Sequence, residues 1–115
     1  ILITLVDFFG DVPYSEALLG SDNLNPVADS GESVYAAAIG LLDDAIANFS
    51  GDAAANPQYD FFYDHDWDQW IKAANTLKMK AYIATRLVDP SAESNFMTIV
   101  NSGNYIVSSD DDLQF

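Results

Sequence analysis

Apolar side chains between residues 35 and 49 repeat at helical spacing, and this repeat restricts the fold more than any other feature of the sequence. Successive members are four, three, four and three positions apart: Tyr35, Ile39, Leu42, Ile46 and Phe49. This spacing places all five on one face, because an α-helix turns once every 3.6 residues. We expect the helix to begin near residue 29 or 30. Asp29 with Glu32 has the spacing of a capping box, and Ser30 is a competing N-cap.

A second amphipathic helix is predicted from about Trp67 to Leu87. Asp66 and Gln69 repeat the capping-box spacing, and Asp68 adds favourable negative charge in the first turn. One stripe of this helix is rich in alanine, which allows a neighbouring helix to approach closely: Trp67, Trp70, Ala74, Leu77, Ala81 and Ala84. Met79 and Ile83 lie on the opposite face together with Lys72 and Arg86. We therefore expect the helix to contact protein on two sides, and its basic residues to have acidic neighbours.

Shorter helical segments flank these two. Residues 1–9 have the pattern of the end of a helix, which Gly10 stops. A last helix is expected to start at Asp89–Pro90, with Pro in the first position, and to end before Gly103. Polar stretches at 20–30 and 50–58 break the chain between helices. No convincing pair of strands is present, so the sequence predicts an all-α fold of antiparallel helical hairpins, stacked as in a solenoid.

Charge is distributed unevenly along the 115 residues. Residues 1–71 contain thirteen acidic residues and neither Lys nor Arg, and the formal net charge is −14. Such a surface repels phosphate backbones and anionic lipid headgroups, which argues against nucleic acid as a partner. Cysteine is absent, which excludes disulfides, thiolate catalysis and zinc–thiolate sites. No apolar run approaches the eighteen or so residues that suggest a membrane span.

Three segments, in this order, resemble the SusD/RagB family of outer-membrane nutrient-binding lipoproteins. They are "LVDFFGDVPYSEAL", "DSGESVYAAAIGLLDDAIANF" and "YDHDWDQWIKAANTLKMKAYIATRL". The resemblance covers about residues 3–88. It implies a superhelix of tetratricopeptide-like hairpins at the cell surface and an oligosaccharide as ligand. It also implies a SusC-like, TonB-dependent outer-membrane transporter as the partner, over which the protein sits as a lid.

Departures from the family pattern concern length and one motif position. The lipid-bearing N-terminal Cys of the family is missing, and members are usually several times longer. We therefore expect residues 1–115 to be an interior helical fragment of a larger SusD-like domain, with any lipid anchor outside it. His65 stands where the family motif has a Gly before the Asp.

The aspartates at the start of the second helix alternate as calcium ligands do. Asp64, Asp66 and Asp68 match the first three ligand positions of an EF-hand. However, Gln69 then stands where a Gly must turn the chain, and Asn75 where a bidentate Glu belongs. An EF-hand is therefore rejected, and no metal or cofactor is expected.

Looser calcium binding stays an open alternative at two places. One is the same aspartate-rich entrance, and the other is the acidic segment of residues 108–115. A run of charges is more often a solvated loop, which we expect for residues 108–115.

Aromatic rings gather in the loop before the second helix, beside Asp60 and Asp64. Aromatic faces pack on the C–H faces of sugar rings while carboxylates accept hydrogen bonds from hydroxyl groups. This pattern makes Tyr59, Tyr63 and Trp67 the candidate ligand-binding residues. A structural role competes with binding at each of them, since Trp67 and Trp70 occupy the predicted core stripe. We expect Trp70 to be structural, whereas the two loop tyrosines could serve either role.

Signatures of catalysis are missing. The sequence has one His and none of the nucleophile-elbow, Walker, Rossmann or zincin motifs. Carboxylate pairs carry no information among eighteen acidic residues. We therefore expect a non-catalytic protein that captures oligosaccharide at the outer membrane. The alternative from another class is a helical-repeat scaffold that binds a protein or peptide.

Overall fold

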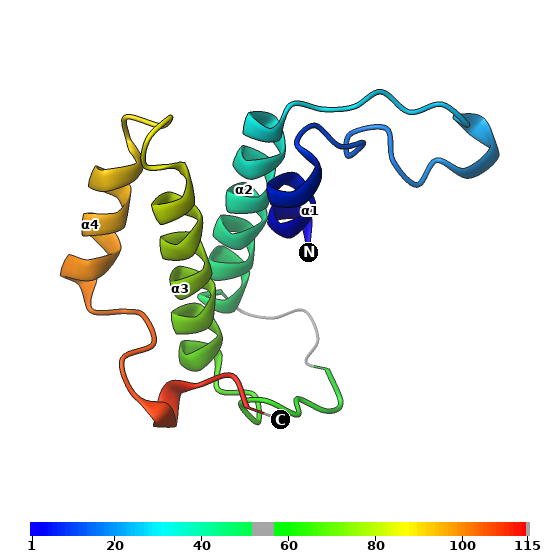
Figure 1. Ribbon diagram of the computed structural model, residues 1–115. Coiled ribbons are helices and arrows are strands. Elements are labelled where there is room, and N and C mark those ends of the chain that lie inside the picture. Colours follow the sequence, from blue (N-terminus) through cyan, green and yellow to red (C-terminus); the bar gives the residue numbers. More distant parts are fainter. Residues whose placement is uncertain (52–56, 115) are drawn as a thin grey trace. The chain divides into compact units, whose positions relative to one another are not determined.

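The computed structural model describes residues 1–51 and 57–114 and contains four α-helices (Figure 1). They are α1 (Leu2–Phe9), α2 (Gly31–Phe49), α3 (Trp67–Thr85) and α4 (Ala92–Ser102), with 3₁₀ turns η1 (Gly20–Asp22) and η2 (Ser109–Asp111). The predicted all-α fold is thus confirmed. Most of the chain break predicted at residues 50–58 lies outside the described residues. Among those that are described, no helix is long and apolar enough to cross a membrane.

Two compact units make up the chain, residues 1–40 and residues 41–115, and the division falls inside α2. In the first unit, α1 ends at Gly10, whose N–H bonds to the carbonyl of Val6 and whose φ of 76° turns the chain out of the helix. Tyr35 of α2 is buried and donates its hydroxyl hydrogen to the carboxylate of Asp7 on α1. Burial and this carboxylate raise the pKa of Tyr35 to about 12. The two helices are therefore joined by a polar contact as well as by packing.

A loop of residues 13–28 connects α1 to α2, and its two ends are tied together. Val12 and Asp29 form an isolated antiparallel bridge, with N···O distances of 3.1 and 3.0 Å. The Asp29 carboxylate accepts the N–H groups of Tyr14 and Ser15 at 2.8 and 2.9 Å, and the Ser15 hydroxyl at 2.7 Å. These bonds lower the pKa of Asp29, the one from the Ser15 side chain most of all. We call this arrangement the loop stem.

Asp29 is consequently not the N-cap of α2, and the predicted capping box with Glu32 is wrong. Ser30, the competing cap, accepts the N–H of Ser33 at 3.2 Å. The Asp11 carboxylate accepts the N–H of Gly31 at 3.0 Å and satisfies another donor of the first turn. Asp29 was assigned wrongly because its carboxylate reaches back across the stem, a contact that spacing along the chain does not reveal.

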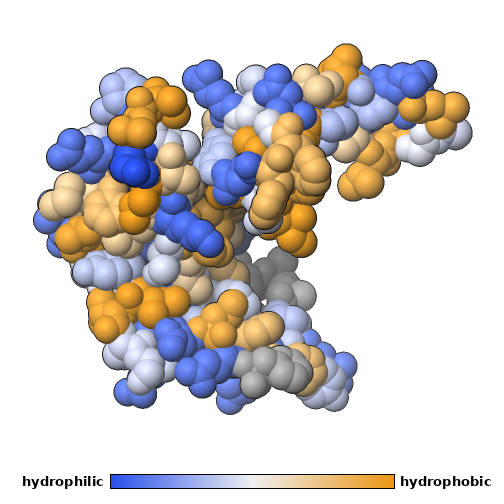
Figure 2. Space-filling model, viewed as in Figure 1, coloured by the Kyte–Doolittle hydropathy of each residue, from blue (hydrophilic) through white to orange (hydrophobic). Residues whose placement is uncertain are grey.

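Large apolar side chains project from the loop of residues 13–28 into solvent. Leu18 and Leu24 are fully or largely exposed, and Leu19 and Val27 are more than half exposed. Figure 2 shows hydrophobic surface interspersed with hydrophilic surface along this loop. The backbone is nevertheless ordered by internal bonds, because the Glu16 carboxylate accepts the side-chain amide of Asn23 at 2.8 Å. The loop thus combines a fixed path with an apolar exterior.

Two glycines of α2 should respond oppositely to the same substitution. A Cβ on Gly31 would lie 2.8 Å from Cγ1 of Val6, whose β-branched side chain has little freedom to move. A Cβ on Gly40 would meet nothing within 4 Å among the described residues. We expect Gly31→Ala to destabilise the chain by about 1–2 kcal/mol and Gly40→Ala to stabilise it by about 1 kcal/mol. Urea denaturation measures both, and equal effects would contradict the close α1–α2 approach.

In the second unit, Asp66 caps α3 as predicted. Its carboxylate accepts the N–H groups of Asp68 and Gln69 at 3.1 and 3.2 Å. The reciprocal half of the capping box is not formed, because the N–H of Asp66 donates to the carbonyl of Tyr63 at 2.9 Å. The buried Oε1 of Gln69 has no hydrogen-bond partner among the described residues. The cap therefore consists of the bonds that Asp66 accepts, without a return bond from the side chain of Gln69.

The buried face of α3 differs from the predicted stripe. Ala74 and Ala81 are buried and Trp67 and Trp70 half-buried, but Leu77 is 53% exposed, and Ala84 is exposed as well. Three buried residues were missed: Ile71, Ala73 and Tyr82. The shift arises because α4 and η2 both contact α3 and so determine which side is covered. On α2 the predicted stripe holds better, since Tyr35 is buried and its other four members are half-buried.

Helices α3 and α4 form an antiparallel hairpin (Figure 1). Helix α4 begins at Ala92, so the predicted start with Pro90 in the first turn is wrong. The Asp89 carboxylate accepts the N–H and hydroxyl of Ser91 at 2.8 and 2.7 Å and holds the turn before the helix. Gly103 ends α4 with φ 67°, as predicted. Beyond it, the chain returns to α3, where the N–H of Ile106 donates to the Thr76 hydroxyl at 2.9 Å.

Candidate functional site

The loop before α3 is organised around the carboxylate of Asp60. Its two oxygens accept four hydrogen bonds, from the N–H groups of Phe62 (3.0 Å), Tyr63 (3.3 Å) and His65 (3.1 Å) and from the indole N–H of Trp70 (2.6 Å). Partial burial works to raise the pKa of Asp60, but these bonds, led by that of Trp70, outweigh it and lower the pKa to about 2. A charged Asp60 therefore fixes the loop against α3.

Aromatic rings of α2, the loop and α3 form one cluster in the second unit. Phe49 stacks on Trp67 and Trp70, with ring centroids 5.7 and 6.1 Å apart. Phe62 and Tyr63 meet Trp70 edge to face, with centroids 5.9 and 5.2 Å away. Offset and edge-to-face pairs of this kind stabilise a core beyond the area that they bury. Trp70 therefore has the structural role expected of it.

The three predicted ligand residues lie in different surroundings. Tyr59 is 66% exposed and stacks on Phe61, which is 68% exposed, with centroids 6.0 Å apart and the rings within 18° of parallel. Tyr63 is half-buried, and its hydroxyl donates to the carbonyl of Asp111 at 2.9 Å. Trp67 is half-buried at the start of α3. We call Tyr59 and Phe61 the exposed ring pair.

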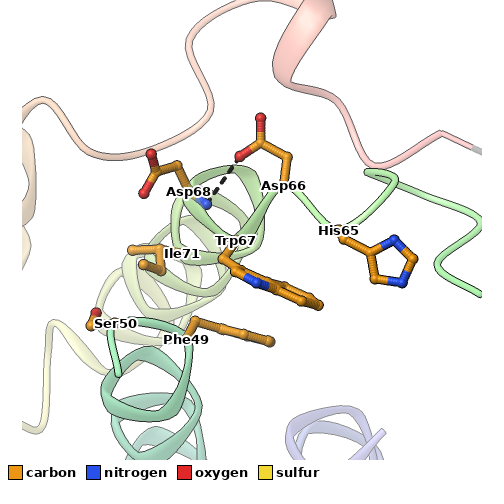
Figure 3. A pocket seen from close by; sticks show the side chains of 7 residues that line it. All are labelled: Phe49, Ser50, His65, Asp66, Trp67, Asp68 and Ile71. Carbon is orange, nitrogen blue, oxygen red and sulfur yellow. Dashed lines mark hydrogen bonds between the residues drawn. The ribbon is translucent and has the colours of Figure 1, made fainter. Parts of the chain in front are cut away.

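Trp67 borders an open hollow of about 480 Å³ (Figure 3). It is lined by apolar and polar residues together: Phe49, Ser50, His65, Asp66, Trp67, Asp68 and Ile71. In Figure 3 the ring of Trp67 lies over that of Phe49, with His65 beyond its far edge. An aromatic surface beside carboxylates suits a ligand with both C–H faces and hydroxyl donors.

His65 adopts a backbone conformation that favours glycine. Its φ is 69°, in the left-handed region that L-residues rarely occupy. The Gly that the family motif has at this position would accept that conformation without strain. Here the conformation is held by the N–H bond to Asp60 and by a 2.9 Å contact between Nε2 and the carbonyl of Pro57. His65 is therefore held by these contacts in a conformation that a glycine would adopt without strain.

Asp111 is the exception to the expected solvation of the acidic C-terminal segment, since residues 108–110 and 112–114 are exposed. It is 6% exposed and pairs with Lys72 of α3, with Oδ1 and Nζ 2.6 Å apart. The Lys72 hydrogen bond, followed by that from the N–H of Val107, lowers the pKa of Asp111 to about 2. The same bond raises the pKa of Lys72. Lys72 thus has the acidic neighbour predicted for it. Phe115, the last residue of the segment, lies outside the described residues.

No three acidic or histidine side chains in residues 1–51 and 57–114 gather closely enough to hold a metal ion. Two of the aspartates considered as calcium ligands have other roles. Asp66 caps α3, and the carboxylate of Asp111 faces Lys72.

Acid should weaken the second unit through Asp60 and Asp111. Each has a folded pKa of about 2, below the ordinary value of 3.8. Their contribution to stability is therefore complete above pH 3.8 and lost as the pH falls through 2. Lys72, whose pKa is raised, acts at alkaline pH. Its contribution to stability is lost as the pH rises above 10.5.

Urea denaturation at a series of pH values checks this expectation. Asp60→Asn and Asp111→Asn should each flatten the acid limb. Asp110→Asn should leave it unchanged, because Asp110 is exposed and its carboxylate has no hydrogen bond among the described residues. An unaltered acid limb in both test variants would contradict the assignment.

Comparison with known proteins places the chain in a family. The model of a SusD-like family, described as starch-binding and associating with the outer membrane, matches residues 1–115. A SusD/RagB family protein of Bacteroides thetaiotaomicron is similar in structure, with a TM-score of 0.81 and 29% identity over 97% of this chain. A SusD homologue of Bacteroides uniformis has a TM-score of 0.76 and 30% identity over 95% of the chain. Among curated proteins, no significant match was found.

A third similar structure is a chitin-binding protein, with a TM-score of 0.75 and 29% identity over 95% of this chain. The chain spans 23% of the length of each of these three proteins. The family description names a binding function at the outer membrane. It agrees with the expectation of a non-catalytic binding protein. The fold, the match over all 115 residues and the three structures lead to one conclusion: the chain belongs to the SusD-like family.

Proposed function

We propose that the protein carrying this chain captures an oligosaccharide at the outer membrane, does not cleave it, and passes it to a TonB-dependent transporter. The observation that carries this proposal is the exposed ring pair of Tyr59 and Phe61, which lies in the same unit as the hollow beside Trp67. The family description and the chitin-binding relative support a glycan as the ligand class. The transporter and the position of the protein over it as a lid are implied by the family resemblance.

Tyr59 and Trp67 are proposed to touch the sugar directly. Tyr59 offers an exposed ring at the surface, and Trp67 lines the hollow. Tyr63 is also proposed as part of the site, although its hydroxyl is already bonded to the main chain of Asp111. Its contribution would come from its ring. The acidic surroundings favour a neutral or weakly charged glycan over a polyanionic one.

Replacing Tyr59 with alanine tests the proposal. Stacking of one aromatic ring contributes on the order of 1 kcal/mol, so we expect about fivefold weaker binding of the glycan. Calorimetric titration of the full protein against neutral, amino and acidic oligosaccharides measures this. Phe9→Ala, which removes another exposed ring in the first unit, is the matched control and should bind as the wild type does.

Two results would contradict the proposal. If the wild type binds no glycan of the panel but binds peptides, the alternative of a protein-binding helical scaffold replaces it. If it binds a glycan and Tyr59→Ala and Trp67→Ala both bind equally well, the binding site lies elsewhere in the protein.

A further inference from the structure

We propose that Asp60 is the positioning residue of the glycan-binding surface, an inference that rests on the proposed function. Asp60 stands between the two members of the exposed ring pair, so it is the one residue that links them along the chain. Its carboxylate is held by four hydrogen bonds, and this fixes the backbone from which both rings project. Tyr59 and Phe61 point outward while Asp60 itself is half-buried between them.

The four bonds divide between the two oxygens in a way that only a carboxylate satisfies. Oδ1 accepts from Phe62 and Tyr63, and Oδ2 accepts from His65 and the indole of Trp70. All four partners are donors, so an amide in place of the carboxylate would turn its NH₂ group toward two of them. A donor facing donors leaves buried polar groups unpaired, which costs more than the lost bonds alone.

Trp70 connects this loop to the rest of the cluster. Its indole N–H donates to Asp60 at 2.6 Å, and its ring stacks on Phe49, which also stacks on Trp67 beside the hollow. Trp70 therefore contacts both regions. It bonds to Asp60, which lies between the two exposed rings in the chain, and it packs on Phe49, which lines the hollow. This geometry gives Asp60 a role in ligand affinity in addition to its role in loop stability.

The test separates positioning from stability in Asp60→Asn. Glycan affinity is measured by titration on the full protein and expressed per folded molecule, with the folded fraction taken from near-ultraviolet circular dichroism. We expect Asp60→Asn to weaken affinity about fivefold per folded molecule, as the loss of the Tyr59 ring does. In the Tyr59→Ala/Phe61→Ala background the same substitution should change affinity less than twofold, because the surface that it positions is gone. Adding Trp70→Phe to Asp60→Asn should partly restore affinity, since it removes one of the two opposed donors.

Other outcomes overturn the inference. If Asp60→Asn lowers the folded fraction but leaves the affinity per folded molecule unchanged, Asp60 only braces the loop. The same conclusion follows if its effect is fully additive with the double ring deletion. Amide hydrogen exchange at Phe62, Tyr63 and His65 gives a readout that needs no ligand. Faster exchange there in Asp60→Asn, in a protein that binds no glycan, would overturn the proposed function and leave the hydrogen-bond assignment intact. Unchanged exchange would contradict the positioning role itself.

Discussion

Replacing Trp70 with alanine is expected to lower the free energy of unfolding by about 3 kcal/mol. The substitution removes three ring contacts at once, with Phe49, Phe62 and Tyr63. It also removes the indole donor from Asp60. Because the cluster draws on α2, the loop and α3, the loss should appear in the cooperative transition of the whole second unit. Urea denaturation followed by circular dichroism measures it.

Two variants divide this effect into its parts. Trp70→Phe keeps most of the ring contacts and removes only the N–H, so we expect a smaller loss. Leu77→Ala is the control for truncating a large side chain on the same helix, and its 53% exposure predicts a loss below about 1 kcal/mol. If Trp70→Ala also lost less than about 1 kcal/mol of stability, the tryptophan would not be part of the core.

Substituting Lys72 by methionine is expected to lower the melting temperature by several degrees and to release residues 103–114 from α3. Methionine keeps the length of the side chain but leaves the Asp111 carboxylate, which is 6% exposed, without its cation. The pair is partly buried, and removing one partner is destabilising because the remaining charge is uncompensated. Thermal unfolding and amide hydrogen exchange at Val107, whose N–H donates to Asp111, measure the two effects.

The double variant Lys72→Met/Asp111→Leu serves as its control. Apolar side chains that replace both members of a buried pair often restore the lost stability. We expect the double variant to melt above the single one. Lys80→Met, at an exposed position of α3, should melt as the wild type does. A single variant that melts no lower than Lys80→Met would contradict the structural role of the pair.

Local sequence signals predicted the helices well because their causes are local. The spacing from Tyr35 to Phe49 and the cap at Asp66 each depend on residues within a few turns, and both are found in the structure. Gly103 ended α4 for the same reason, since a left-handed residue there is an intrinsic preference of glycine. Where a side chain reached across the chain, as at Asp29, the same reasoning failed.

The candidate site was predicted only in its aromatic part. Rings that cluster in sequence identified the loop, but nothing in their spacing showed that Tyr59 would be exposed and Tyr63 packed against Trp70. The sequence identified Asp60 only as an acid among aromatic residues. Its position between rings and before a tryptophan-rich helix could have indicated that it bonds to the loop and to Trp70. Asp111 gave no such signal, because its partner Lys72 is 39 positions away and its neighbours are also acidic.

The loop stem has a consequence for how this part of the chain can vary. Two main-chain bonds between Val12 and Asp29, with the carboxylate bonds beside them, fix the distance between the end of α1 and the start of α2. Whatever lies between residues 15 and 28 is therefore insulated from the helices, since closing a somewhat longer loop costs little additional entropy. Insertions, deletions or a grafted peptide can be accepted there while the register of α2 stays the same. Because the stem holds the two ends of the loop together, the segment between them can be replaced while the end of α1 and the start of α2 keep their spacing.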